Sequence, residues 1–320
     1  MNPYKGTGFF EFIALFFQRC KLIFHAESLQ EDEIQIYILF FLGVSTALIG
    51  SFLMLQKKMM LVNSISHTIL IGIVGFIGGM KWLHGQEYVF DPSFSFQSLV
   101  IPAFISSILT YYLTNMLIEK FKIQEDASIG IVFTFLFGLS IFIISFMGRN
   151  SHLGLEAILG NLDAVNLQDC LLCMKVCGFV FIVIIFLFPY FTLISFDQAF
   201  AKLIGMHCKI MDLILIFFCG LVLIVGFKSV GVIMILALMT IPLLISRLFY
   251  SSIYQILMAT IALHGIISVI SVAVSRALLS YYKLSVSTSG VLVVLLGFIY
   301  FFCLIIKNYK IKKFIRPSIF

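Results

Sequence analysis

The stretch IQIYILFFLGVSTALIGSFLML, residues 34–55, contains no charged side chain. A helix needs about 20 apolar residues to cross a hydrocarbon core of roughly 30 Å. The stretch therefore has the length and composition of a membrane-spanning helix. Similar stretches recur along the chain, which predicts an all-α, polytopic bundle of transmembrane helices.

The recurring apolar runs cover most of the chain. After residues 34–55 they occupy residues 59–79, 98–118, 128–147, 170–194, 211–227, 229–249, 253–274 and 287–306. We predict about nine spans, with eight or ten as alternatives, because only Lys228 separates two of the runs. The runs show none of the polar and apolar alternation that is typical of barrel strands.

The composition excludes a water-soluble globule. Of the 320 residues, 61% are hydrophobic and 11% are charged, and the mean hydropathy is +1.12. Soluble domains carry about 25% charged residues. The seven cysteines, an odd number, do not form the pattern of a disulfide framework. Cys170, Cys173 and Cys177 share a helical face, where packing is favoured over a soft-metal site.

The positions of lysine and arginine predict the orientation, because these residues concentrate in cytoplasmic loops. With the N-terminus outside and the C-terminus inside, twelve lie on the inner side and six on the outer side. The inner set is Lys57, Lys58, Lys120, Lys122, Lys202, Lys209, Arg247, Lys307, Lys310, Lys312, Lys313 and Arg316; the outer set is Lys81, Arg149, Lys175, Lys228, Arg276 and Lys283. Residues 307–320 then form a basic cytoplasmic tail beside anionic membrane lipid.

The first 33 residues differ from the rest. An apolar stretch over residues 9–17 is interrupted by Glu11 and followed by Arg19, so it is too short and too polar to span a membrane. We predict that residues 1–33 form an N-terminal extension with an amphipathic helix at the membrane interface. A signal peptide is the alternative, without a clean basic start or cleavage site. The transmembrane domain is residues 34–306.

The sequence contains no energy source of its own. No Asp or Glu lies well inside an apolar run, where an ion-coupled carrier normally has a carboxylate. The nearest approach to a Walker motif, around Gly220 to Ser229, has the wrong spacing. Uphill transport by this chain would therefore require a separate ATPase subunit. A carrier or channel that needs no ATPase is the alternative.

Polar side chains in the second run form a candidate ion site. Asn63 and His67 are four residues apart and therefore share one helical face, and Ser66 lies beside them. Imidazole is the commonest protein ligand for transition metals. His264 falls in the eighth run, and for both histidines a packing role is the alternative. A hydrolase site from Ser66 and His67 is disfavoured, because neighbouring residues on a helix point about 100° apart.

Four segments together point to a family. They are GSFLMLQKKM with NSISH (residues 50–59 and 63–67), QEDASIGI (124–131), FDQAFAKLIG (196–205), and the stretch from Val230 to Arg247. In this order they resemble the ABC-3 family, the membrane permeases of bacterial metal-ion ABC importers. The resemblance covers about residues 40–306 and leaves the N-terminal extension unexplained.

The resemblance implies a multi-pass permease of the bacterial cytoplasmic (inner) membrane. Such a permease passes Mn, Zn or Fe from an extracytoplasmic metal-binding protein to the cytoplasm by alternating access. The resemblance also implies a second permease subunit, identical or different, with the translocation path at the interface. ATP is held by separate cytoplasmic ATPase subunits, so the chain is not itself an enzyme. No permanent cofactor and no nucleic acid partner is expected.

The resemblance also implies roles for particular residues. The segment 196–205 is expected to contact the ATPase, with Phe196, Asp197, Ala201, Lys202 and Gly205 as its coupling residues. His67 matches the family's metal-binding histidine, and Ser66 and His264 are possible path-lining residues. The family usually has Asp four residues before this histidine, whereas this chain has Asn63, a neutral and weaker ligand. A carboxylate from a different permease subunit would favour a heterodimer.

Overall fold

The computed structural model describes residues 3, 4, 6, 8–19, 29–84, 96–147 and 160–315. The elements in these ranges are α1 (Phe9–Arg19), α2 (Glu31–Leu55), α3 (Met59–His84), α4 (Phe96–Glu119), α5 (Glu125–Met147), the 3-10 turn η4 (Leu162–Ala164), α7 (Leu167–Phe196), α8 (Gln198–Leu203), α9 (Cys208–Val230), α10 (Val232–Phe249), α11 (Ile253–Tyr282) and α12 (Thr288–Ile315). Within the described ranges, nine helices are long and apolar enough to cross a membrane. The predicted all-α transmembrane bundle is confirmed. Residues 20–28 of the extension, Arg149, and residues 316–320 of the basic tail lie outside the described part.

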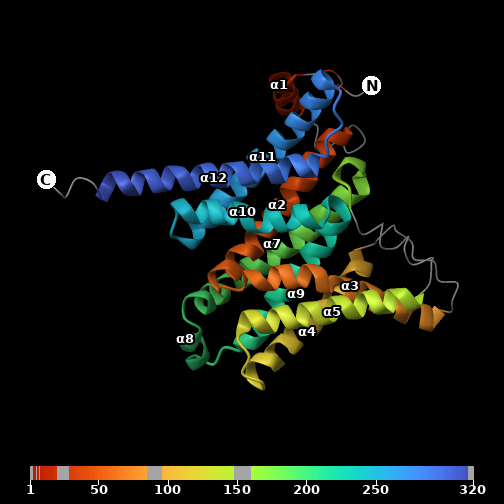
Figure 1. Ribbon diagram of the computed structural model, residues 1–320, viewed down its shortest axis with the longest axis vertical. Coiled ribbons are helices and arrows are strands. Elements are labelled where there is room, and N and C mark those ends of the chain that lie inside the picture. The colour runs from red at the N-terminus through yellow and green to blue at the C-terminus, as the bar shows by residue number, and fades with distance from the viewer. Residues whose placement is uncertain are drawn as a thin grey trace.

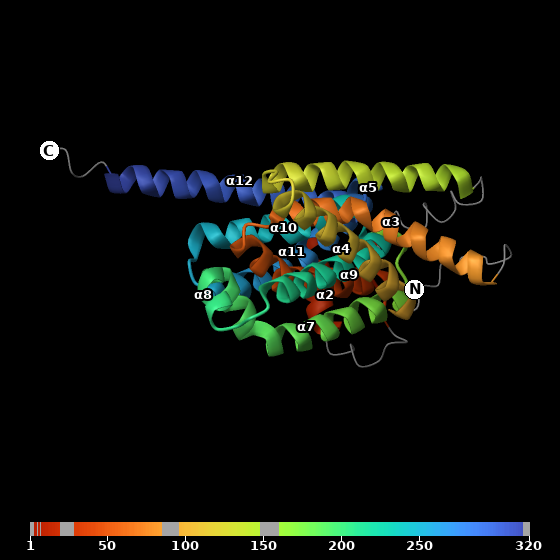
Figure 2. The same ribbon diagram turned by 90° about the horizontal axis from the view of Figure 1, so that it is seen from below.

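Helix α2 is the centre of the bundle (Figure 1). In the most apolar 18-residue stretch of α2, 83% of the residues are buried, whereas in that of α12 only 11% are buried. Helices α7, α9, α10 and α11 pack around α2, whereas α3, α4 and α5 form a second group that joins the first mainly through α9. Helix α12 lies on the outside and extends beyond the other helices (Figure 2).

The helix directions alternate, so the connections gather at two ends of the bundle (Figure 2). We call these the α8 end and the α1 end. The α8 end holds the basic connections between α2 and α3 and between α4 and α5, together with Lys209, whose carbonyl accepts a hydrogen bond from the Tyr111 hydroxyl at 3.0 Å. The basic residues predicted to share one side of the membrane therefore share one end of the fold. The side that this end faces stays a prediction.

Helix α1 covers the opposite end of α2 and packs against α11. Its Phe12 and Phe16 are buried, whereas Phe10 and Phe17 are 83% and 65% exposed. Tyr4 donates a hydrogen bond to Glu33 at 2.6 Å, and Arg19 donates one to the same carboxylate at 2.7 Å. Burial, reinforced by the bond to Glu33, raises the pKa of the Tyr4 hydroxyl. Residues 9–19 thus form a two-faced helix, as predicted, and its place at a membrane interface stays a prediction.

The break between α9 and α10 lies at Gly231, three residues after the position predicted at Lys228. Gly231 has a φ of +90°, which a glycine adopts without strain. Lys228 instead lies in the last turn of α9, where its Nζ is 3.0 Å from Oδ1 of Asp169. This ion pair with α7 neutralises the lysine, so α9 continues past it to Val230, and the two runs form two separate helices.

Candidate functional site

Helix α3 brings Asn63 and His67 to the outer surface of the bundle beside α5. Asn63 is exposed and His67 is half-buried. The His67 ring lies 5.0 Å from the ring of Phe133 and 5.6 Å from the ring of Phe137, measured between centroids. The predicted pair therefore shares one helical face, as its spacing requires, and this face is open to a ligand or a second chain.

The polar residues Ser64, Ser66 and Thr68, which are close neighbours of this pair on α3, are buried in the bundle interior. Ser66 is buried, and its hydroxyl donates to the Asn63 carbonyl at 2.6 Å. The Thr68 hydroxyl lies 2.8 Å from the hydroxyl of Thr110 on α4. Gly72 packs closely against α4, because a Cβ added there would overlap the Pro102 carbonyl oxygen. Helix α3 therefore has a sealed face toward α4 and an accessible face with Asn63 and His67.

His264 lies in a different part of the bundle, between α2, α10 and α11. The side chain is buried, with Nδ1 at 2.7 Å from the Thr260 carbonyl and Nε2 at 3.0 Å from the Leu238 carbonyl. Gly43 of α2 lies directly against the ring. Both ring nitrogens thus have carbonyl partners, and the structure does not bring this histidine together with Asn63 and His67. A path-lining role for it stays a prediction.

The predicted coupling segment forms the short helix α8 with a cap at each end. The Asp197 carboxylate accepts a hydrogen bond from the Phe200 amide at 2.9 Å, as an N-cap residue does. Gly205, with a φ of +87°, follows the helix and turns the chain toward α9. Ala201 is fully buried against Ile194 and Cys208. The local sequence thus specifies a tight, closed turn between α7 and α9.

Helix α8 and the residues at its two ends present an apolar surface outward. The exposed fractions of Phe196, Phe200, Leu203 and Ile204 are 70%, 49%, 85% and 58%, and Lys202 is exposed beside them. A cluster of large apolar side chains at a loop end is typical of a protein contact surface. The five residues predicted for coupling therefore lie within and directly beside α8, with Ala201 buried beneath the helix and Phe196 and Lys202 exposed.

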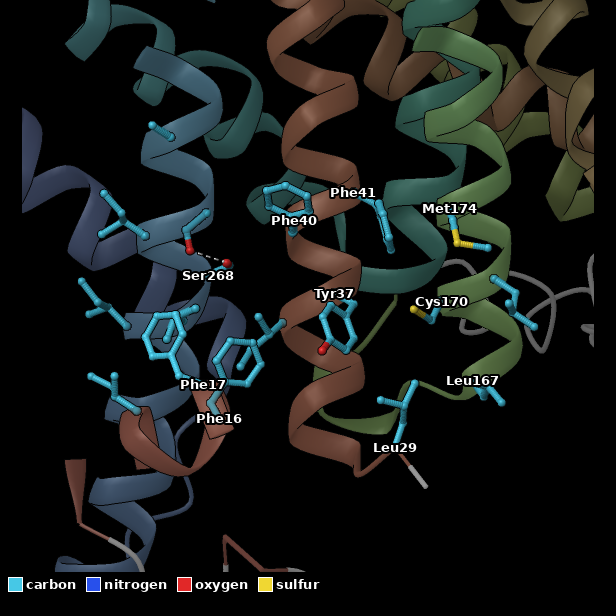
Figure 3. Close-up of a pocket in the computed structure, with 18 residues that line it drawn as sticks. Phe16, Phe17, Leu29, Tyr37, Phe40, Phe41, Leu167, Cys170, Met174 and Ser268 are labelled. Carbon is cyan, nitrogen blue, oxygen red and sulfur yellow. Dashed lines mark hydrogen bonds between the residues drawn. The ribbon is translucent and has the colours of Figure 1, made fainter. Parts of the chain in front are cut away.

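An apolar pocket of about 720 Å³ lies between α1, α2, α7 and α11 (Figure 3). Phe16 and Phe17 of α1, Phe40 of α2 and Met174 of α7 are among its lining residues. The Ser268 hydroxyl donates to the Gly265 carbonyl at 2.9 Å, so it is already satisfied. Most of the lining is aliphatic or aromatic carbon, so the pocket suits an apolar group better than a hydrophilic ion.

The cysteines of α7 pack rather than gather around a ligand set. The Cys173 thiol is buried 3.4 Å from the Ser229 hydroxyl of α9. Over the ranges that the structure describes, no cluster of three or more His, Cys, Asp and Glu side chains could hold a metal ion. Asn63 and His67 would therefore need further ligands from outside the described chain.

Two contacts at the α8 end were not found by sequence reasoning. Lys58 Nζ lies 2.7 Å from Asp212 Oδ2, and Gln56 Nε2 lies 3.5 Å from Ser195 Oγ. The only signal in the sequence was Asp212, which is the second residue of an apolar run that is otherwise uncharged. Its partner could not be chosen among the lysines of the predicted inner side, because helix packing decides which one is near.

The described architecture has counterparts among known proteins. PsaBC from Streptococcus pneumoniae in complex with Fab has the same fold, with a TM-score of 0.69 over 91% of this chain and 95% of that one, at 22% sequence identity. The manganese transport system membrane protein MntD of Bacillus subtilis is 28% identical, over 81% of this chain and 86% of its own length.

A relative from Chlamydia trachomatis, described as "Probable metal transport system membrane protein", is 34% identical over all of this chain and 98% of its own length. The family described as ABC 3 transport family matches residues 34–307. These residues cover all or nearly all of each apolar span, except the end of α12, together with α8 and the face with Asn63 and His67. The chain therefore belongs to the ABC 3 transport family of membrane proteins.

Proposed function

We propose that the chain is one permease subunit of an ATP-driven importer that passes a divalent transition-metal ion into a bacterial cell by alternating access. The metal transport named for its relatives supports this substrate class. Manganese is the first candidate ion, and zinc and iron share the preference for imidazole ligands. The importer would lie in the bacterial cytoplasmic membrane, with the α8 end inside.

The observation that carries the proposal is that an exposed Asn63 and a half-buried His67 share one face of an apolar span. A polar side chain that faces lipid is costly, and in membrane proteins such groups line cavities or contact other protein. The face that holds them is therefore best explained as one wall of a path, closed by a second permease subunit.

Helix α5 supplies the surface on which a second subunit can pack. Gly130, Thr134 and Gly138 are exposed and recur every four residues. A Cβ added at either glycine would have no neighbour within 4 Å, and a shallow hollow is lined by Ala127, Gly130, Ile131, Thr134 and Phe135. Small residues of this spacing allow close approach of two membrane helices. The partner would complete the ligand set, and a carboxylate from a different subunit would compensate for Asn63.

The apolar face of α8 is the proposed seat of a cytoplasmic ATPase. The ATPase holds and hydrolyses ATP, so this chain supplies only the path and the contact. A metal-binding protein would deliver the ion at the α1 end. Residues 1–33 would cover that end as an interfacial element, residues 34–306 would form the permease, and residues 307–320 would be the cytoplasmic tail.

The test is manganese uptake by vesicles that contain the chain with its partner subunits. We expect uptake with ATP, and loss of uptake when the ATPase carries an inactivating substitution. Uptake that persists without any ATPase would favour a secondary carrier or channel and would overturn the proposal. Co-purification of the ATPase with this chain, lost after Phe196→Ser plus Leu203→Ser, would locate the contact at α8.

A further inference from the structure

The short connection between α2 and α3 holds the two helices that flank α8. Gln56 reaches Ser195 in the last turn of α7, at 3.5 Å. Lys58 reaches Asp212 in the second turn of α9, at 2.7 Å. Helix α8 joins α7 to α9. Any displacement of α8 therefore acts on helices that are bound to this connection.

The ion pair between Lys58 and Asp212 is sheltered from water. The side chains are 19% and 8% exposed, whereas those of Lys209 and Glu119, which pair at 2.6 Å at the same end, are 72% and 55% exposed. Exposed pairs of this kind contribute little to stability, and sheltered pairs hold a fixed geometry. The Oδ1 atom of Asp212 is buried without a hydrogen-bond partner in the described chain. Lys58 is therefore the group that neutralises this carboxylate.

Lys58 is joined to the candidate metal site by a continuous helix. Lys57 has a φ of +61°, and the Lys58 amide donates to the Leu53 carbonyl at 2.8 Å, which closes α2. Helix α3 then begins at Met59. His67 lies nine residues after Lys58, about 14 Å along the axis at 1.5 Å per residue. A shift of Lys58 would therefore be carried to His67 by a rigid element.

We propose that the ion pair between Lys58 and Asp212 couples the movement of α8 to helix α3 and so positions Asn63 and His67 during transport. The inference rests on the proposed function, in which a docked ATPase moves α8. When α9 is displaced, the buried charge pair displaces the start of α3. Lys58 and Asp212 are positioning residues that do not touch the ion.

The experiment measures manganese transported per ATP hydrolysed by the assembled importer in lipid vesicles. Lys58→Met and Asp212→Asn are each expected to lower this ratio at least about tenfold, within the range of coupling between distant sites. Lys58→Arg keeps the positive charge, so most of the manganese transport per ATP should be retained. Lys209→Met and Glu119→Gln, which remove the exposed lysine–carboxylate pair at the same end, serve as the matched controls and should leave this ratio unchanged.

A second variant separates coupling from folding. Lys58→Met with Asp212→Leu removes both charges and leaves no buried charge unpaired, so the chain is expected to assemble. An apolar contact does not fix the position of α3 relative to α9 as an ion pair does. The manganese transported per ATP should therefore again fall about tenfold. A wild-type ratio in this assembled double variant would overturn the inference.

The proposed contact with the ATPase is tested separately. It depends on co-purification of the ATPase, whereas the coupling inference depends on the ratio of metal to ATP. If Phe196→Ser plus Leu203→Ser leaves the ATPase bound, the proposed seat at α8 is wrong, and with it the route through Lys58. If the ATPase is lost in that variant but the charge variants transport normally, only the coupling inference is wrong.

Discussion

The imidazole ring of His67 on α3 lies 5.0 Å from the phenyl ring of Phe133 on α5, with the ring planes 46° apart. Phe137, one turn further along α5, lies 5.6 Å away. Both contacts are with aromatic carbon, so they hold the ring without occupying its nitrogens by hydrogen bonds. A histidine held in this way can bind and release an ion while the helices keep their packing.

Substitution of His67 by alanine is expected to lower manganese uptake at least about tenfold, since loss of groups that support a metal site costs roughly 10–100-fold. Ser66→Ala is the matched control, because the Ser66 hydroxyl bonds its own helix and faces the interior. Both variants should reach the membrane in equal amounts. Undiminished uptake by His67→Ala would contradict the assigned site.

Asn63→Asp is expected to strengthen metal binding, because a carboxylate is a charged and stronger ligand than an amide oxygen. The apparent KM for manganese should fall, by about tenfold if the ionic bond adds about 1.4 kcal/mol. Asn63→Ala should raise it. Initial uptake rates over a range of manganese concentrations measure both, and equal KM values in the two variants would remove Asn63 from the path.

Gly205→Ala is expected to weaken the ATPase contact. Gly205 has a φ of +87°, and an alanine in this region costs roughly 1–2 kcal/mol. The strain would displace the turn after α8. Gly205→Asn is the control, because asparagine tolerates left-handed conformations better than alanine. Co-purification of the ATPase should fall more in Gly205→Ala than in Gly205→Asn, and the reverse order would show that the turn is not critical.

Gly43→Ala is expected to destabilise the bundle core. A Cβ at this position would lie 2.6 Å from ring atoms of His264, and overpacking of a close-packed core costs about 1–3 kcal/mol. Gly178→Ala on α7 is the control, since a Cβ there meets nothing within 4 Å. Thermal unfolding in detergent should show a lower midpoint for Gly43→Ala only. Equal midpoints would mean that the His264 ring can shift without cost.

Tyr4→Phe is expected to loosen α1 from the bundle, because it removes the hydrogen bond to Glu33. A hydrogen bond to a charged group contributes about 1.5–3 kcal/mol. A spin label on Phe10→Cys, an exposed position of α1, should become more mobile in the Tyr4→Phe background. A Phe17→Cys label on the same helix should report the same change, and unchanged mobility at both would place the anchor elsewhere.

The same contact predicts a response to alkaline pH. The pKa of Tyr4 is raised in the folded state. The contribution of Tyr4 to the stability of the fold is therefore complete below the ordinary tyrosine pKa of about 10, and it is lost as the pH rises through the higher pKa of the folded state. The label on α1 should therefore stay immobile at neutral pH and become mobile only in strongly alkaline solution. In Tyr4→Phe this alkaline transition should be absent.

Much of the fold could be predicted because its signals are local. Residues 34–55 specify a span on their own, since an uncharged run of this length is stable in hydrocarbon whatever its neighbours are. Asp197 and Gly205 specify the two ends of α8 by a cap and a positive φ, which also act within a few residues. The spacing of Asn63 and His67 already predicts that they share one face of α3.

Tertiary structure alone decided how these elements meet. The pairing of Lys58 with Asp212, the contact of His264 with the Leu238 carbonyl and the anchoring of α1 through Tyr4 join residues that are far apart in the chain. Hydropathy could not predict these contacts, because every span is similarly apolar. Which helices pack together depends on the shapes of their surfaces and on single polar pairs between them. Local composition and spacing therefore specify a bundle of membrane helices, whereas the packing of α3 against α4 and α5 leaves one polar face of α3 open.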